Sequence, residues 1–466
     1  KNSNQHTLRD LSNNAVSTTE FFPSWGKARL EAMIKNRPDW CVSRQRNWGV
    51  PIPIFLHKET SEPHPKTSLF FEKVAEMIEK EGIDAWFNLN AKTLLGEDIN
   101  GYRKISDTLD VWFDSGTTHE SVLAQRDDLA LQADLYLEGS DQHRGWFQSS
   151  LLTSCAMNEK APYKALLTHG FVVDGQGYKM SKSKGNVIAP QKIMDQYGAD
   201  ILRLWVATTD YSGELNISDE ILKRVADSYR RIRNTLRFLC ANLADFDFKK
   251  DNIKPDEMIS LDRFAIFKVE QLQNSVLDHY EKFEFYLAMQ KFVAFCSEEL
   301  GGFYLDIIKD RLYTTKEDSF ARRSAQTALY HISHSLMRVM APVLSFTAHE
   351  LWEVLCKGTN HSIFSDYWYE LPNHLLSSDD IKDWDNVIKV RSLANKRIEE
   401  VREAGKIGSS LQAQLKIKAN KDIIKSLEKF EGDLRFIFIT SNVSIEGHED
   451  EPVSYTHLRA HETADN

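Results

Sequence analysis

The sequence lacks paired cysteines, long apolar runs and an excess of basic charge. Its five cysteines are scattered over 466 residues. They form no C-x-x-C pair, which argues against a zinc knuckle or a disulfide scaffold and favours a reducing, cytosolic setting. No stretch approaches the roughly 20 apolar residues of a membrane span, and no secretory signal opens the chain. The formal net charge is −10, so a nucleic-acid partner would have to be bound by local basic patches.

The two ends of the chain differ from its middle. Position 1 is Lys rather than Met and no domain-like pattern begins there, so we expect the chain to be cut from a longer one. Residues 453–466 have no apolar period and follow an acidic break. We interpret residues 451–466 as a non-native tail, with a native disordered tail as the alternative.

Residues 44–217 show an α/β pattern of predicted secondary structure. Short apolar runs end in Gly or polar loops, and helix-like segments follow them. Ala133–Leu137 and Ala165–Val173 are predicted strands, separated by a predicted helix over Gly145–Met157. Strands that alternate with helices predict a parallel, doubly wound sheet.

Two segments stand apart from this α/β pattern. Residues 1–43 are polar and mixed, with one amphipathic helix around Trp25–Lys35. Residues 60–102 interrupt the alternation with an acidic helix of their own, Phe70–Glu81, and are predicted to be an insertion.

Long segments with a 3.6-residue apolar period begin after Ser218, whose Asp-Glu successors resemble a capped helix start. They predict a helical bundle over residues 218–383, with helices at Asp219–Leu243, Ser260–Tyr280, Phe283–Lys309, Ala321–Val339 and Pro342–Leu355. Pro342 suits the first turn of a helix. Residues 384–450 predict a charged helix to Ala404 and a small α/β unit with strands at Leu411–Ile417 and Leu434–Thr440.

The strongest chemical signal is Lys179-Met-Ser-Lys-Ser183, which follows a turn-rich strand exit. Lys179 and Lys182 offer ammonium charges, and Ser181 and Ser183 offer hydroxyl donors, so the loop can fold over a polyphosphate. Such a loop can stabilise the charge that develops on a departing pyrophosphate. A solvated basic loop is the alternative.

A second polar stretch, Leu137–Phe147, lies between a predicted strand and a predicted helix, where open α/β sheets bind ligands. Glu138 and Asp141 can accept hydrogen bonds from a ribose or an ammonium group, and Gly139 permits close backbone approach. Gln142 offers both a donor and an acceptor. The alternative is a simple helix N-cap, for which Asp141 would suffice.

Two further stretches carry tryptophans beside polar loops. In Asp110–Gly116, Trp112 could wall an aliphatic pocket or lie in the core, and the core is the commoner place for such a residue. Ser43–Pro51 combines two arginines with Trp48. This segment could contact nucleic acid, or it could be a strand start with exposed arginines. The sequence favours neither interpretation.

Taken together, these stretches resemble bacterial-type isoleucyl-tRNA synthetases, a family of class I aminoacyl-tRNA synthetases. The lysine loop is shared by several class I families, and four longer runs point to the isoleucine family: WCVSRQRNWGVPIP (40–53), DVWFDSG (110–116), LEGSDQHRGWFQSSL (137–151) and LTHGFVVDGQG (167–177). The similarity runs from about Phe22 to Gly447.

The resemblance implies a fold and a set of roles. Residues 44–217 would be the second half of a Rossmann-like catalytic domain, residues 218–383 the anticodon-binding bundle, and residues 1–43 the trailing segment of the editing insertion. Lys182, assisted by Lys179, would bind ATP, and Ser181, Ser183 and His169 would lie near it. The isoleucyl-adenylate would be bound by Glu138, Gly139, Asp141, Gln142, Trp112 and Trp146. For Trp146 the alternative is helix–sheet core, and for His169 a strand-end histidine whose hydrogen bonds are satisfied.

The implied reaction activates isoleucine with Mg-ATP and transfers it to tRNA-Ile. The implied parent is a cytoplasmic monomer that contacts no membrane. The H-x-G-H signature of the family is absent from the 466 residues, and so are the editing domain and the paired-cysteine zinc knuckle. We therefore expect the chain alone to be inactive and to bind no zinc.

Contact with tRNA would need basic residues in the helical region. Arg230, Arg231, Arg233 and Arg237 form a stripe on the first long helix and could contact phosphates. Two further groups are Lys309, Arg311, Lys316, Arg322 and Arg323, and Lys389, Arg391, Lys396 and Arg397. A solvated, salt-bridged face is the commoner meaning of such groups. A valine-specific ligase and a non-catalytic tRNA-binding protein remain the alternative functions.

Overall fold

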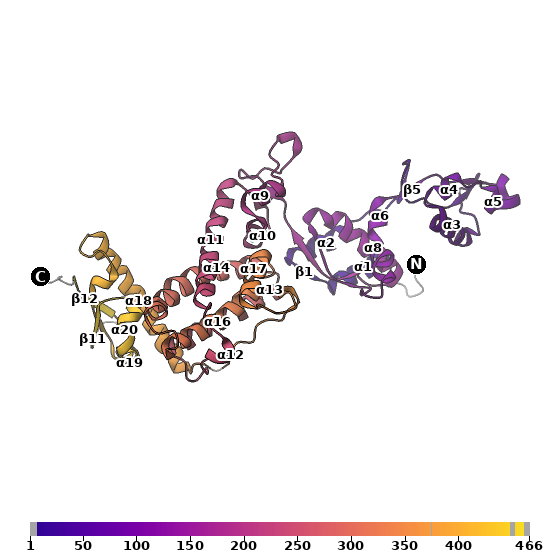
Figure 1. The fold of residues 1–466 in the computed structure, drawn as a ribbon. Helices are drawn as coiled ribbons and strands as arrows, with labels where there is room; N and C mark the ends of the chain where they lie inside the picture. The colour runs from indigo at the N-terminus through magenta and orange to yellow at the C-terminus, as the bar shows by residue number, and fades with distance from the viewer. Residues whose placement is uncertain (1–6, 374, 448–452, 461–466) are drawn as a thin grey trace. The chain divides into compact units, whose positions relative to one another are not determined.

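The computed structural model describes residues 7–373, 375–447 and 453–460. The chain divides into two compact units (Figure 1). The first comprises Lys1–Lys179 and Tyr211–Asn216, and the second comprises Met180–Asp210 and Ile217–Asn466. Met180–Asp210 thus packs with the helical unit, although we expected it in the catalytic half-domain of residues 44–217. That domain boundary stays a prediction.

The core of the first unit is a three-stranded parallel sheet in the order β1-β7-β6. β6 (Ala133–Gly139) and β7 (Tyr163–His169) are connected by helix α8 (Trp146–Asn158). Leu166 of β7 packs with Phe147, Leu151 and Cys155 of α8 in one buried cluster. Parallel strands need such a crossover. The strand–helix–strand prediction is confirmed, although the second strand ends at His169 and a short β8 (Val172–Val173) follows it.

The amino-terminal segment belongs to this same core. β1 (Glu20–Phe22) pairs in parallel with β7, and α1 (Leu8–Ser17) and α2 (Trp25–Lys35) bury Val16, Leu30 and Ile34 against it. The predicted helix around Trp25–Lys35 is confirmed. The apolar side chains of this segment complete the sheet and its helical cover. Its assignment as the trailing segment of the editing insertion stays a prediction.

The expected insertion has its own small core. β3 (Phe55–His57) pairs antiparallel with β4 (Tyr102–Lys104). Between these strands lie α3 (Thr67–Glu81), α4 (Asp84–Asn88), α5 (Lys92–Leu95) and η1 (Gly96–Asn100). Their buried side chains form a cluster separate from that of the sheet: Phe55, Phe70, Val74, Trp86 and Leu95. This separate cluster agrees with an insertion whose ends extend slightly beyond residues 60–102.

Short elements complete the first unit: β2 (Ser43–Arg44), β5 (Thr108–Leu109), α6 (Val111–Gly116), α7 (Thr118–Ser121), η2 (Leu123–Gln125), η3 (Ser140–Arg144) and β9 (Leu215–Asn216). The second unit begins with η4 (Lys182–Lys184), α9 (Pro190–Tyr197) and α10 (Ala199–Thr208).

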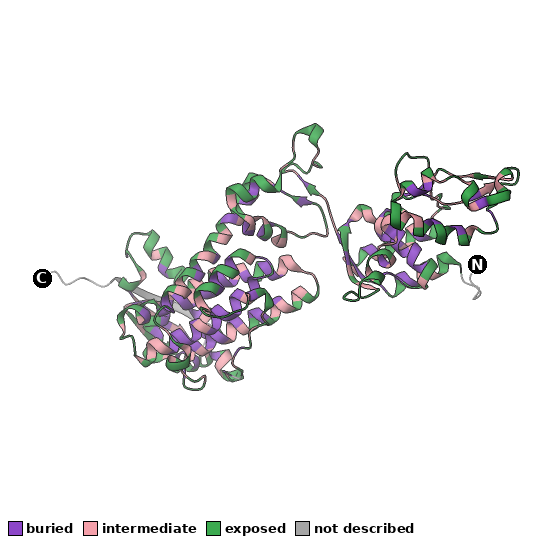
Figure 2. Ribbon diagram, turned by 45° about the vertical axis from the view of Figure 1, so that its right-hand side comes forward, coloured by how far each residue is buried: buried purple, intermediate pink, exposed green. Residues whose placement is uncertain are grey.

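The second unit is dominated by helices whose inward faces are buried (Figure 2). Its main helices are α11 (Asp219–Asn242), α13 (Ser260–Glu281), α14 (Phe285–Ala294), α15 (Asp306–Thr314), α16 (Phe320–Met340) and α17 (Ser345–Leu355), with the shorter α12 (Phe248–Asp251) and η6 (Ile363–Ser365). Ser218 caps α11 by accepting a hydrogen bond from the Ile221 N–H at 3.3 Å. The predicted helix from Pro342 is corrected, because α17 begins at Ser345.

The predicted helix Phe283–Lys309 is a composite. The π-helix η5 (Phe295–Leu305) joins α14 to α15. It contains Gly301 and Gly302, and a π-helical turn accommodates one extra residue that a regular apolar period does not reveal. The sequence therefore predicted a helical segment here but not its widened middle.

The carboxyl-terminal part of this unit contains α18 (Ser378–Glu403), η7 (Ser410–Gln412) and a small sheet. In that sheet β10 (Ala413–Ala419) pairs in parallel with β11 (Asn442–Gly447) and antiparallel with β12 (Val453–Ala460). α19 (Lys421–Glu428), η8 (Glu431–Asp433) and α20 (Leu434–Phe438) lie between β10 and β11 in the sequence.

Two expectations for this region are corrected. The predicted strand Leu434–Thr440 was wrong, because a short apolar run does not distinguish a buried helical turn from a strand, and α20 forms there. Within the expected tail of residues 451–466, residues 453–460 form β12, which corrects the disordered alternative and leaves the non-native interpretation untested. Residues 451, 452 and 461–466 of that tail lie outside the described residues. Among the described helices, none combines the length and apolarity that a membrane crossing needs.

Two buried histidines make the second unit sensitive to acid. His331 and His334 lie on α16 and are each 6% exposed. The Tyr369 hydroxyl lies 2.8 Å from His331 Nδ1, and Arg338 Nη1 lies 3.1 Å from His334 Nδ1. Burial lowers the pKa of His331 to about 4, and burial together with the Arg338 charge lowers the pKa of His334 to about 3. Both side chains are therefore neutral in the folded unit at pH 7.

We expect the second unit to lose stability as the pH falls below the unfolded histidine value of about 6.5. The unfolded chain binds protons there that the folded chain does not, so each histidine should cost about 2 kcal/mol at pH 5. Urea unfolding of the chain between pH 8 and pH 5 measures this loss. The double variant His331→Gln, His334→Gln should flatten the profile, whereas His349→Gln, at an exposed histidine, should leave it unchanged. If the free energy of unfolding of the double variant depended on pH as steeply as that of the unaltered chain, the two histidines would not be the cause of the acid sensitivity.

Candidate active site

The carboxyl ends of β6 and β7 lie at the same edge of the parallel sheet. Gly139, the last residue of β6, is in register with His169, the last residue of β7. Glu138 is exposed beside them, and its Oε2 accepts a hydrogen bond from the Gly139 N–H at 3.0 Å. The sheet therefore presents a carboxylate and an imidazole at its ligand-binding edge.

Gly139 allows the turn after β6 to close tightly. A Cβ atom added there would lie 2.8 Å from Asp141 Oδ1 and 3.7 Å from His169 Cε1. The first distance is shorter than real Cβ contacts, so a side chain would displace the Asp141 carboxylate. His169 is itself half-buried, and its Nδ1 lies 2.8 Å from the Gly170 carbonyl oxygen. Glu138, Gly139, Asp141 and His169 are thus brought together as predicted.

Gln142 connects this turn to helix α8. Its Oε1 accepts a hydrogen bond from the Trp146 N–H at 3.0 Å, and its Nε2 donates to Asp141 Oδ2 at 3.1 Å. The side chain therefore satisfies the first N–H of α8 and orients the carboxylate of Asp141. The N-cap position of α8 is Gly145, without a side-chain cap, so the capping alternative does not describe Asp141.

The two predicted tryptophans flank the same turn. Trp146 is half-buried, stacks on Tyr136 with ring centroids 4.0 Å apart, and donates from Nε1 to the Ser115 carbonyl at 2.9 Å. Trp112 is 43% exposed, and its ring edge lies 2.8 Å from the position of a Cβ added to Gly145. Trp146 is thus fixed on both its face and its edge, and Trp112 is open to solvent beside it. An exposed ring of this kind favours a wall over a core position for Trp112.

Asp110 anchors the loop that carries Trp112. It accepts hydrogen bonds from Trp40 Nε1 at 2.9 Å and from the Trp112 N–H at 3.1 Å, and it pairs with Arg44 at 2.6 Å. Burial raises the pKa of Asp110, but these hydrogen bonds and the charges of Arg44 and Arg46 together bring it below its ordinary value. Asp110 is therefore an ionised structural anchor.

The two interpretations of Ser43–Pro51, a strand start and a contact with nucleic acid, apply to different residues of the segment. Arg44 is held by Asp110, which supports a structural role for that arginine. Trp48 is 80% exposed, and Gly49 next to it has φ of +149°. The tip of this loop thus keeps a free aromatic surface, which is the feature that a nucleic-acid contact requires.

The lysine loop is divided between the two units. Lys179 belongs to the first unit and places its Nζ 4.3 Å from the centroid of the Phe171 ring. Ser181, Lys182 and Ser183 belong to the second unit, where the Ser181 N–H donates to Asn186 Oδ1 at 2.9 Å and the two serine hydroxyls lie 3.2 Å apart. Lys182 is exposed in the short turn η4. Its approach to Glu138 stays a prediction.

Sequence reasoning missed three residues that build this site. Tyr136 supports the ring of Trp146, Gly145 leaves room for Gln142 and Trp112, and His143 is fully buried under the turn. His143 Nε2 has no hydrogen-bond partner among the described residues, and burial lowers its pKa. Tyr136 and Gly145 could have been suspected from their positions two residues before Glu138 and one before Trp146. The packing of His143 has no sequence signal.

The predicted arginine stripe on α11 is not uniform. Arg230, Arg231 and Arg237 are exposed, and Arg230 pairs with Asp227 on the same helix. Arg233 instead joins α11 to α17 through two hydrogen bonds of 2.8 Å to Glu350, which raise the pKa of the arginine and lower that of the glutamate. Arg233 is therefore a packing contact between helices.

The arginines of the other two basic groups are mostly paired or buried, whereas their lysines are exposed. Arg311 pairs with the buried Asp262, and Arg322 and Arg323 pair with Asp245. Arg391 is buried, and Arg397 pairs with Glu400 on its own helix. The salt-bridged alternative accounts for Arg311, Arg322, Arg323 and Arg397. Arg391 instead donates to the backbone carbonyls of Ile437 and Gly302. In the part of the chain that the structure describes, no three His, Cys, Asp or Glu side chains are grouped as a metal site.

Comparisons with known families agree with this architecture. Residues 3–218 match the family described as tRNA synthetases class I (I, L, M and V). Residues 262–427 match the anticodon-binding domain of tRNA ligase.

Individual relatives match nearly all of the chain. The isoleucine–tRNA ligase of Nitrosomonas europaea is 58% identical over 448 residues, which are 95% of this chain and 48% of that protein. The isoleucine–tRNA ligase of Thiobacillus denitrificans is 58% identical over 441 residues, 95% of this chain and 47% of that protein. The chain thus spans about half the length of the curated relatives it matches.

Solved structures share the fold at low sequence identity. The LeuRS–tRNA–LeuAMS ternary complex of Agrobacterium radiobacter K84 is 17% identical with a TM-score of 0.53, over 90% of this chain and 51% of that chain. Mycobacterium tuberculosis methionyl-tRNA synthetase in complex with methionyl-adenylate is 16% identical with a TM-score of 0.54, over 79% of this chain and 66% of that chain.

We expect Gly145→Ala to destabilise the first unit, because its Cβ would lie 2.5 Å from Gln142 Oε1 and 2.8 Å from Trp112. Overpacking of this kind costs about 1–3 kcal/mol. Gly213→Ala is the matched control, since an added Cβ there meets nothing within 4 Å. Denaturant unfolding followed by tryptophan fluorescence compares the two variants. Equal midpoints would show that the turn around Gln142 is not tightly packed.

Proposed function

The chain belongs to the class I tRNA synthetases, and from this we propose that it is the carboxyl-terminal part of an isoleucine–tRNA ligase. The observation that carries the proposal is the cluster at the carboxyl edge of β6 and β7, where Glu138, Asp141, Gln142 and His169 adjoin the rings of Trp112 and Trp146. A polar turn beside an aromatic wall suits a ligand with a ribose at one end and an aliphatic side chain at the other. The two relatives named above support isoleucine as the amino acid.

In the first proposed step, a carboxylate oxygen of isoleucine attacks the α-phosphorus of ATP. The new O–P bond gives isoleucyl-adenylate, and the bond to the bridging oxygen breaks to release pyrophosphate. Lys182, with Lys179, Ser181 and Ser183, would stabilise the charge on the leaving phosphates. Mg²⁺ would arrive bound to the ATP phosphates. Protein carboxylates would act as additional ligands of the ion.

The adenylate would be bound at the edge of the sheet. Glu138 and the Gly139 backbone would contact the aminoacyl end, Asp141 and Gln142 the ribose, and His169 the adenosine. Gly139 matters because a side chain there would displace the Asp141 carboxylate. In the second step the terminal ribose hydroxyl of tRNA-Ile attacks the carbonyl carbon of the mixed anhydride, and AMP leaves.

Trp112 and Trp146 would wall the isoleucine side chain. Because isoleucine and valine differ by one methylene, such a pocket separates them by only about 1–3 kcal/mol, a limit for which isoleucyl-tRNA synthetases are the standard example. A valine-specific ligase is therefore the nearest alternative. We further propose that the parent protein is a cytoplasmic monomer.

The chain by itself should not catalyse activation, because its 466 residues contain no H-x-G-H motif. We expect no isoleucine-dependent ATP–pyrophosphate exchange from the isolated chain. Exchange should appear when the chain is mixed with the missing amino-terminal half of the Nitrosomonas europaea relative. Isoleucine should support it at a higher kcat/KM than valine. Exchange by the chain alone would refute the proposed division of the active site, and higher valine activity would favour the valine ligase.

In the reconstituted enzyme we expect Lys182→Ala to lower kcat by about 100-fold to 1,000-fold, the usual effect of removing a group that stabilises developing charge. Lys192→Ala removes an exposed lysine of α9 and should change kcat less than twofold. Pyrophosphate exchange at saturating ATP measures both. Comparable losses in the two variants would assign the effect to general charge.

We expect Arg231→Ala and Arg237→Ala to weaken tRNA binding and to lower the slope of log affinity against log salt by about 0.7–0.9 each. Arg233→Ala should change this slope less, because Glu350 already pairs with its guanidinium. Filter binding of tRNA to the isolated chain from 50 to 200 mM salt gives the three slopes. Identical slopes for all three variants would show that the Arg233–Glu350 pair opens to bind RNA.

A further inference from the structure

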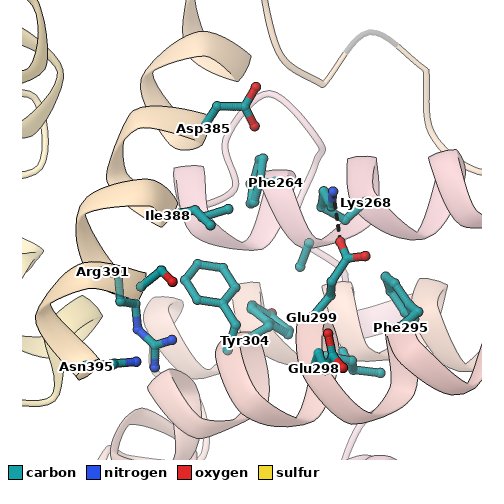
Figure 3. Close-up of a pocket in the computed structure, with 14 residues that line it drawn as sticks. Phe264, Lys268, Phe295, Glu298, Glu299, Tyr304, Asp385, Ile388, Arg391 and Asn395 are labelled. Atoms are coloured by element: carbon teal, nitrogen blue, oxygen red, sulfur yellow. Dashed lines mark ion pairs between the residues drawn. The ribbon is translucent and has the colours of Figure 1, made fainter. Parts of the chain in front are cut away.

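A pocket of about 500 Å³ lies between three helices of the second unit (Figure 3). α13 contributes Phe264 and Lys268, η5 contributes Glu298 and Phe303, and α18 contributes Arg391 among other side chains. The volume is in the range of sites for nucleotide-sized ligands. None of the residues that line it belongs to the candidate active site.

Arg391 is the unusual residue of this pocket. It is only 9% exposed, and its donors reach two backbone carbonyls: Nε donates to Ile437 at 2.8 Å, and Nη1 to Gly302 at a long 3.4 Å. Among the described residues no carboxylate lies within ion-pairing distance of it. Burial lowers its pKa, with the charge of Asp306 acting in the opposite direction. A guanidinium carries five N–H donors, so this buried cation keeps donors for an anionic group.

Polar and aromatic groups extend the site from Arg391. Ser392 and Asn395 are on the same face of α18, and both are exposed. The guanidinium of Arg391 lies over the Phe303 ring, 5.1 Å from its centroid. Phe264 stacks on the buried Trp384 with centroids 5.0 Å apart and is itself only 1% exposed. The half-buried Phe303 is therefore the ring that a planar group can reach. Arg391 and Asn395 suit a phosphate, and the carboxylate of Asp385 lies at the other end of the pocket from Asn395 (Figure 3).

The opposite side of the pocket carries acceptors. Figure 3 shows Glu298 and Glu299 on η5, across from Arg391 and Asn395 on α18. Glu299 pairs with Lys268 at 2.8 Å, whereas Glu298 is exposed and has no ion pair among the described residues. A free carboxylate accepts hydrogen bonds from an exocyclic amino group. The pocket is thus anion-binding at one side and amine-binding at the other.

The π-helical backbone of η5 also distinguishes this pocket from an ordinary gap between helices. Phe295, Glu298 and Phe303 all lie on the π-helical segment Phe295–Leu305. π-helical turns are rare, and they occur frequently at functional sites. The widened turn carries both the free carboxylate of Glu298 and the ring under Arg391.

We propose that this pocket binds one nucleoside monophosphate unit, with its phosphate at Arg391 and Asn395, its base against Phe303, and an exocyclic amino group at Glu298. The unit comes either from a free nucleotide or from an unpaired nucleotide of a bound RNA. The RNA source rests on the proposed tRNA ligase function. The free-nucleotide source does not.

The test uses cytidine and uridine monophosphate as probes, because they differ at position 4, where cytidine has an amino group and uridine a carbonyl. Titration of the chain is followed by tryptophan fluorescence, since Trp384 stacks on Phe264. We expect cytidine monophosphate to bind about tenfold more tightly than uridine monophosphate, the effect of one hydrogen bond to a charged group. Glu298→Gln should remove this preference.

Asn395→Asp and Lys396→Ala form the matched pair, because each lowers the net charge by one on the same exposed helix. Asn395→Asp should weaken cytidine monophosphate binding about tenfold through repulsion at the phosphate side, and Lys396→Ala less than twofold. A parallel loss of tRNA affinity in Asn395→Asp assigns the nucleotide to RNA, and unchanged tRNA affinity assigns it to the free nucleotide.

Two results would overturn the proposal. One is the absence of saturable binding by either monophosphate together with equal tRNA affinity of Asn395→Asp and the unaltered chain. The other is equal weakening by Asn395→Asp and Lys396→Ala, which would indicate general electrostatics. A chain that binds no tRNA would refute the proposed ligase function and still leave the monophosphate titration as a test of the pocket.

Discussion

The parallel pairing of β6 with β7 is the constraint on which the candidate active site depends. Because both strands run in the same direction, the chain leaves them at one edge, and Glu138 and His169 become neighbours although 31 positions separate them in the sequence. The turn that follows β6 must then be tight. Gly139 and Gly145 make this possible. A Cβ at Gly139 would collide with Asp141, and a Cβ at Gly145 would collide with Gln142 and Trp112. The two glycines therefore allow the polar residues of the turn to lie close together.

Several charged residues of the helical unit pair with one another inside it. The carboxylate of Asp262 is fully buried, and it accepts hydrogen bonds from Arg311, Tyr304 and Ser324 at 2.6 to 3.0 Å. Buried charges of this kind need complete partners, because an unpaired charge in the core is costly. The number of basic residues in a helical sequence consequently overstates the surface available to RNA. Arg391 is the exception, since burial there is accompanied by two carbonyl partners and no carboxylate among the described residues.

The lysine motif shows how a short segment can have two structural contexts. Lys179 is held near the Phe171 ring in the first unit, whereas Lys182 projects from a turn that Asn186 closes in the second. The sequence presents the two lysines as equivalent members of one phosphate-binding loop. Both lysines are exposed, but Lys179 lies over the Phe171 ring and Lys182 begins the short turn η4.

The sequence alone determined the alternation of strand and helix around α8, the start of α11 at Ser218, and the chemical nature of the two polar stretches. These features follow from local periodicity, capping and side-chain chemistry. Tertiary structure decided that β1 completes the sheet, that residues 434–438 form a helix, and that Arg233 serves packing while Trp112 stays open to solvent. Those outcomes depend on which surfaces meet, and a short apolar run or a lone arginine carries no information about the partner that will cover it.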